Sequence, residues 1–207
     1  MKKVDRKMLL FGFLLCLLPI LVGFYYYDLL PDKIATHFNV HNQPDDFVSK
    51  TWGIIGIPLG MGVLFVILSV ILDIREEAQK GATMIKVTIP ILSIVVQGGV
   101  IYYALDNNFD IGKLTLFTIG IILMVLGNYL PKKEYWGKYN FNLCGLEEGL
   151  NEQKFIRIYS RFIVIGGGLI FVSAFLDNRI GLTLVIVFAI LSAILPFYLA
   201  KKYRIKD

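Results

Sequence analysis

The chain has 207 residues, of which 56% are hydrophobic and 18% are charged, and its net charge is +5. A water-soluble domain would carry about 25% charged residues and about 45–50% apolar residues. The composition therefore excludes an ordinary soluble enzyme domain and indicates a protein whose solvent is largely a lipid bilayer. The basic residues stand at the ends of apolar runs, where they fix membrane topology, so we expect no direct contact with nucleic acid.

Six apolar runs stand out, and a helix that crosses a bilayer needs about 20 residues. They predict an all-α integral membrane protein with one membrane domain over residues 1-207, built as a bundle of about six transmembrane helices. The expected helices cover residues 8-27, 52-72, 87-105, 114-130, 157-176 and 180-200. The fifth helix reaches full length if Arg161 extends its charged end to the membrane surface.

Lysine and arginine are distributed unevenly between the predicted connections. Seventeen lie in the two terminal segments and in the second and fourth connections, and four lie in the remaining connections. By the positive-inside rule, we expect both termini in the cytoplasm of a multi-pass protein of the cell membrane. Two connections are long enough to carry a function: a short structured outer loop over residues 28-51 and an inner loop over residues 131-155.

The predicted helices hold no carboxylate, lysine or histidine near the middle of the membrane, where ion-coupled transporters usually place such groups. Their notable polar side chains are Gln97 and Asn128, which form a second candidate cluster with Arg161. Hydrogen bonding between helices is the main interpretation of these residues, and contact with a substrate is the alternative.

Glycines mark candidate packing faces in three of the predicted helices. They are Gly56 and Gly60 in the second helix, Gly112, Gly120 and Gly127 in the fourth, and Gly166, Gly167 and Gly168 in the fifth. Small residues allow membrane helices to approach closely. We expect tight packing within one bundle, with a dimer interface or a hinge as the alternatives.

The outer loop contains both histidines of the chain, His37 and His41. Its β-branched residues and its Asn-Gln-Pro-Asp cluster predict a strand followed by a turn, with Asn42 in a left-handed conformation and Pro44-Asp45 closing the turn. In a strand, residues four apart are separated by about 13 Å, too far for one metal ion unless a tight turn lies between them. We therefore expect no metal site.

The inner loop combines glutamates with six basic residues and holds Cys144. Paired carboxylates can perform acid–base chemistry, but here no nucleophile, metal-ligand set or positioned histidine accompanies them. A solvated charged loop is the better interpretation. The sequence thus predicts no catalytic residue and no cofactor.

Two segments resemble a known family. Leu30-Pro31, Ile34, His37-Phe38-Asn39, Pro44-Asp45 and Lys50 resemble the motif that follows the first membrane helix of SdpI-like bacterial membrane proteins, with Ala35 and Asn42 in place of the usual Pro and Gly. The run from Gly127 to Lys132 is similar to a second family segment. After it Asn140, Gly145 and Ser160-Arg161 can be matched, whereas residues 146–150 replace the family's Arg-Thr-Pro-Trp part.

The resemblance implies a non-enzymatic immunity protein of a Gram-positive bacterium, which protects the producing cell against a secreted antimicrobial peptide. Its partner would be the peptide toxin or the toxin's membrane target. The outer-loop residues expected to bind this partner are His37, Phe38, Asn39, Asn42, Pro44 and Asp45.

Two other functions remain open. One is a signalling or scaffold protein whose basic inner loop recruits a cytoplasmic transcriptional regulator or binds anionic lipid. The other is a small transporter or membrane-embedded enzyme, which would use a polar cavity around Gln97 and Asn128.

Overall fold

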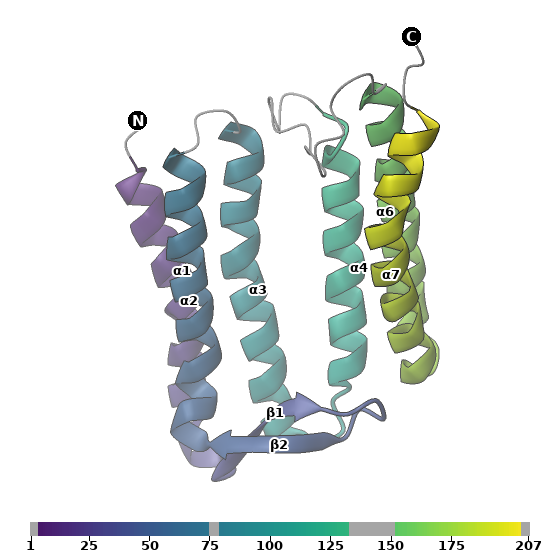
Figure 1. Cartoon of the computed structure of the whole chain (residues 1–207). Coiled ribbons are helices and arrows are strands. Elements are labelled where there is room, and N and C mark those ends of the chain that lie inside the picture. Colours follow the sequence, from purple (N-terminus) through teal and green to yellow (C-terminus); the bar gives the residue numbers. More distant parts are fainter. Residues whose placement is uncertain (1–3, 75–78, 133–151, 204–207) are drawn as a thin grey trace. The chain divides into compact units, whose positions relative to one another are not determined.

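The computed structural model in Figure 1 describes residues 4–74, 79–132 and 152–203. Six of its helices are long and apolar enough to cross a membrane, which confirms the predicted multi-pass helical membrane protein. In chain order the elements are α1 (Arg6–Tyr25), the 3-10 helix η1 (Tyr27–Leu29), β1 (Lys33–Phe38), β2 (Pro44–Ser49), α2 (Lys50–Ile74), α3 (Gln79–Leu105), α4 (Ile111–Tyr129), α6 (Glu152–Ser173) and α7 (Asn178–Lys202).

The expected helix ends differ most from the observed ones at the start of α3, which begins at Gln79 rather than at residue 87. The expected helix begins after Lys86 because a charged residue usually marks the boundary of an apolar run. Lys86 instead lies inside the helix with only 5% of its surface exposed, and it is neutralised by an ion pair with Asp73 of α2. Pairing of this kind is what permits a charged side chain to be buried.

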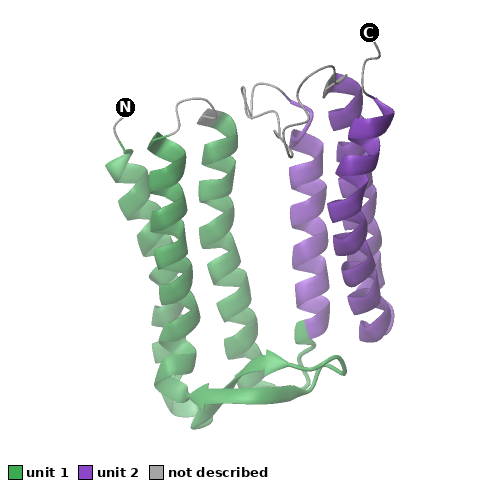
Figure 2. Ribbon diagram, in the orientation of Figure 1, with its two compact units in different colours: residues 1–111 green, residues 112–207 purple. Residues whose placement is uncertain are grey.

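The helices form two compact units, residues 1–111 and residues 112–207 (Figure 2). Unit 1 contains α1, α2 and α3 together with the two strands, and unit 2 contains α4, α6 and α7. The single membrane domain over residues 1-207 stays a prediction.

Within unit 1, glycines let α1 and α2 interlock. A Cβ atom added at Gly12 would lie 2.1 Å from the Phe65 ring, and one added at Gly23 would lie 2.5 Å from Ile54. Real Cβ atoms do not approach other atoms so closely, so the large side chains of α2 fill space that only glycine leaves on α1. Neither glycine of α1 was among the predicted packing positions.

Within unit 2, α4 and α6 approach each other through the glycines that the sequence analysis selected. A Cβ atom at Gly120 would lie 2.8 Å from the Gly167 carbonyl oxygen, and one at Gly127 would lie 2.8 Å from Val164. Close packing is thus confirmed at these positions. The expected close packing within the bundle is wrong at Gly60 of α2, because no described atom lies within 4 Å of a Cβ placed there, apart from its chain neighbours and the backbone of its own helix.

Candidate functional site: a hairpin seated on the ends of two helices

The outer loop of the sequence analysis is a β-hairpin. Strands β1 and β2 pair antiparallel, with Ile34 opposite Val48 and Phe38 opposite Pro44. The predicted strand and turn are confirmed, and Pro44 is the first residue of the return strand rather than part of the turn itself. Proline suits this position because the first residue of a strand can lack a backbone N–H.

The turn between the strands is built by two asparagines. Asn42 has φ 59°, the left-handed conformation that asparagine tolerates better than other non-glycine residues. The Asn39 side-chain oxygen accepts hydrogen bonds from the backbone N–H groups of His41 and Gln43, at 2.9 and 3.1 Å. Asn39 and Asn42, both expected to bind a partner, therefore stabilise the shape of the turn.

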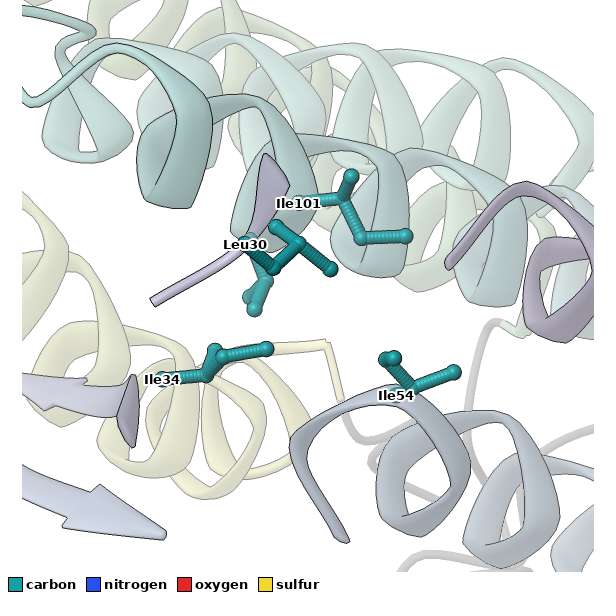
Figure 3. Packing of buried hydrophobic residues seen from close by; sticks show 5 residues of the cluster. Leu30, Ile34, Ile54 and Ile101 are labelled. Atoms are coloured by element: carbon teal, nitrogen blue, oxygen red, sulfur yellow. The ribbon is translucent and has the colours of Figure 1, made fainter. Parts of the chain in front are cut away.

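The base of the hairpin is buried against the helices of unit 1. Leu30 and Ile34 are 4% and 1% exposed, and they form one hydrophobic cluster with Ile54 of α2 and Val100 and Ile101 of α3 (Figure 3). Burying such a side chain contributes about 1.5–3 kcal/mol relative to water. This cluster fixes the start of β1 on the ends of α2 and α3.

Gly53 in the first turn of α2 permits this seating. A Cβ atom added to Gly53 would lie 2.7 Å from the Cβ atom of Ile34, so a larger residue would push the hairpin away. The Gly53 carbonyl oxygen also accepts a hydrogen bond from Gln97 of α3 at 2.9 Å. One glycine thus joins the hairpin, α2 and α3.

The far end of the hairpin is also attached. The Phe38 ring meets the Tyr103 ring edge-on, with centroids 4.8 Å apart. The Asn42 side-chain N–H donates to an Asp110 carboxylate oxygen at 2.8 Å, in the segment that follows α3. Sequence reasoning missed Tyr103 and Asp110, because no local pattern connects residues more than sixty positions apart.

A third set of contacts closes the hairpin where β2 enters α2. The Lys50 ammonium lies 4.9 Å from the centre of the Tyr27 ring and 3.7 Å from an Asp32 carboxylate oxygen. The hydroxyl groups of Tyr27 and Thr51 lie within hydrogen-bond distance, at 3.2 Å. These contacts give the Lys50 of the sequence motif a role in joining the two strand ends.

His37 and Asp45 come together on the exposed side of the hairpin. The His37 Nδ1 atom lies 2.5 Å from an Asp45 carboxylate oxygen, and their side chains are 67% and 44% exposed. The register pairs His37 with Asp46, and irregular pairing on either side of His37 brings Asp45 within reach. This hydrogen-bonded pair links the two strands at a surface that a partner could touch.

His41 lies in the turn and is exposed. The described parts of the chain contain no group of three or more histidine, cysteine, aspartate or glutamate side chains placed to hold a metal ion. Of the residues proposed for partner binding, His37 and Asp45 lie together on the exposed surface. Phe38, Asn39 and Asn42 instead hold the hairpin in place.

The second candidate cluster divides between the two units. Gln97 belongs to unit 1, is fully buried and donates to the Gly53 carbonyl, as expected for a contact between helices. Its side-chain oxygen has no hydrogen-bond partner among the described residues. Asn128 and Arg161 belong to unit 2, where both are exposed. Within unit 2, the neighbouring Ser160 rather than Arg161 reaches α4, by donating to the Gly127 carbonyl at 2.7 Å.

The inner loop expected over residues 131-155 falls mainly outside the described residues, which resume at residue 152. Cys144 and the glutamates at positions 134, 147 and 148 lie in that part. The prediction of a solvated charged loop is thus not tested.

Comparison with known proteins gives one family match. Residues 14–62 match the model described as Domain of unknown function (DUF1648), a domain that occurs in membrane proteins. The matched residues run from α1 through the hairpin into α2. No curated protein and no solved structure matches the chain.

Proposed function

We propose that this chain is a membrane immunity protein that protects the cell producing it against a secreted antimicrobial peptide. The observation that carries the proposal is the seated hairpin, which displays the His37–Asp45 pair while Leu30 and Ile34 are buried against the helices. The SdpI-like motif of the sequence covers the same hairpin. In this proposal the chain acts by binding, either to the toxin itself or to the membrane target that it shields.

The proposal includes an orientation in the membrane. The basic residues favour both termini and the second and fourth connections on the cytoplasmic side, because seventeen of the 21 lysines and arginines lie there. The hairpin would then lie outside the cell, on the side from which a secreted peptide arrives.

A hairpin held at its base, its turn and its far end suits such a role. Binding a partner costs free energy whenever loops and side chains must be ordered, and a surface that is already ordered reduces this cost. Asn39, Asn42 and the Phe38–Tyr103 contact supply that order before any partner arrives. The exposed His37–Asp45 pair then offers both hydrogen-bonding groups and charge.

The test is survival of a sensitive Gram-positive host that expresses the chain and is challenged with secreted peptide toxins. We expect selective survival, and we expect Asp45→Ala to lower the tolerated toxin concentration by about tenfold, the effect of losing roughly 1.4 kcal/mol of binding. Asp28→Ala is the matched control, because Asp28 is an exposed aspartate of η1 outside the hairpin.

Two results would contradict the proposal. One is survival no better than with the empty vector while the protein is present in the membrane. The other is full protection by an Asp45→Ala variant that reaches the membrane at the level of Asp28→Ala. Asn39→Ala is a less specific variant, since its loss would also loosen the turn.

A further inference from the structure

The outer edge of β2 in the two-stranded sheet of unit 1 pairs with no other described strand. β1 packs against α2 and α3, and within the described residues β1 is the only strand that pairs with β2. The side chains of Asp45, Asp46 and Phe47 on β2 are all exposed. Exposed strand edges present backbone groups that can pair with another extended chain.

The hydrogen-bond pattern shows which backbone groups point away from β1. The Lys50 backbone N–H donates to the Asp32 carbonyl oxygen at 2.9 Å. From there the residue pairing continues without a shift as far as Ala35 opposite Phe47. Because antiparallel pairs alternate, the Val48 backbone groups point toward β1, whereas those of Phe47 and Ser49 point outward. Phe47 and Ser49 thus give the outer edge of β2 two neighbouring positions at which another strand could pair.

One outward donor is covered from within the hairpin. The Phe47 N–H donates to an Asp46 carboxylate oxygen at 2.8 Å. A carboxylate in this position disfavours pairing of the edge with the equally acidic hairpin of a second copy of the chain. A peptide carbonyl could replace it, and the released carboxylate would then be available to a cationic side chain.

The charge around this edge favours a cationic partner. Residues 28–51 and 106–110 contain six aspartates, no glutamate and two lysines, although the whole chain has a net charge of +5. One of those lysines, Lys50, already lies close to Asp32. Complementary charge accelerates encounter and disfavours partners of the same sign.

We propose that the outer edge of β2 binds an extended cationic peptide segment, which adds to the hairpin as a third strand. The inference rests on the proposed function, because it specifies how the hairpin would meet a peptide toxin. Backbone hydrogen bonds to Phe47 and Ser49 would supply affinity, in the manner of β-strand addition. Asp45 and Asp46 would select basic side chains on the two faces of the added strand.

The test compares two substitutions of one residue in the full-length protein, held in nanodiscs of neutral phosphatidylcholine. Phe47→Ala removes the ring and keeps the outward N–H. Phe47→Pro removes both, and proline is tolerated on an edge strand where the lost N–H faces solvent. The probe is a short peptide of alternating lysine and valine, with a glutamate-for-lysine version and a fully N-methylated version as controls.

The lysine–valine peptide should bind the wild-type protein, and the other two peptides should bind at least about tenfold more weakly. Phe47→Pro should bind the lysine–valine peptide about tenfold more weakly than Phe47→Ala does. The inference is overturned if the peptide does not bind, if the N-methylated version binds equally well, or if the proline and alanine variants bind alike. If Phe47→Pro fails to fold, binding of the N-methylated peptide to the wild-type protein still tests whether backbone pairing is needed.

Survival assays with the same two variants separate this inference from the proposed function. Equal protection by Phe47→Pro and Phe47→Ala would leave the immunity function standing and remove strand addition as its mechanism. Amide-dependent binding of the lysine–valine peptide, without protection by the wild-type chain against any toxin, would support the docking edge and remove the immunity function.

Discussion

Replacing Lys86 with methionine should destabilise unit 1, because it leaves the carboxylate of Asp73 without its cation. Lys86 is 5% exposed and pairs with Asp73 near the end of α2, away from the hairpin. Asp73 also accepts a hydrogen bond from the Asp5 backbone N–H at 3.1 Å, at the start of α1. The pair therefore joins all three helices of the unit at one end.

The size of the effect follows from what each variant leaves behind. Lys86→Met leaves a largely buried carboxylate without its cation, and breaking a buried pair in this way costs about 3–5 kcal/mol. At about 2–4 °C per kcal/mol for a chain of this length, the melting temperature should fall by about 6–20 °C. The double variant Lys86→Met, Asp73→Leu removes both charges, so it should lose mainly the hydrogen bond to Asp5, about 1 kcal/mol.

Thermal unfolding of the detergent-solubilised protein measures this difference. Lys7→Met is the matched control, because Lys7 is an exposed lysine in the first turn of α1. The reasoning is refuted if Lys86→Met melts at the temperature of Lys7→Met. It is also refuted if the double variant is as unstable as Lys86→Met, since the loss would then come from the lysine itself and not from an unpaired charge.

Four further substitutions test the packing within each of the two units. Gly53→Ala should lower stability by about 1–3 kcal/mol because the new methyl group clashes with Ile34. Gly60→Ala has open space around it and should be neutral or stabilising by up to about 1 kcal/mol. Equal melting temperatures of the two variants would contradict this. Gly120→Ala should cost about 1–3 kcal/mol, since the new methyl group meets the α6 backbone, and an unchanged melting curve would show that the helices can move apart. Gln97→Met should melt no lower than the wild type, because it removes an unpaired buried oxygen along with one hydrogen bond, and loss of protection in a folded variant would instead indicate a substrate contact.

The membrane helices could be predicted because their signal is local. Each depends on the apolar character of about 20 consecutive residues, and no partner needs to be known. The same approach failed at the start of α3, because Lys86 can be buried in the helix only through its ion pair with Asp73, a residue of the preceding helix. A charge in an apolar segment need not end the segment when an opposite charge is present to neutralise it.

The glycines show the same limit. A G-x-x-x-G spacing identified Gly56 and Gly60, yet α2 packs on its neighbours through Gly53 and Gly62. Spacing alone identifies a helix face without bulky side chains. The large residues of the neighbouring elements decide which of these faces is packed. Phe13 of α1 fills the space at Gly62, and Ile34 of β1 fills the space at Gly53.

The hairpin motif combines two kinds of residue that the sequence alone could not separate. Asn39 and Asn42 form the turn, so replacing them changes the shape of the hairpin whatever partner it has. His37 and Asp45 are exposed, so replacing them changes mainly the surface that a partner would meet. A loss of function in the first pair therefore says that the hairpin must be ordered, whereas only a loss in the second pair identifies the hairpin as the contact itself.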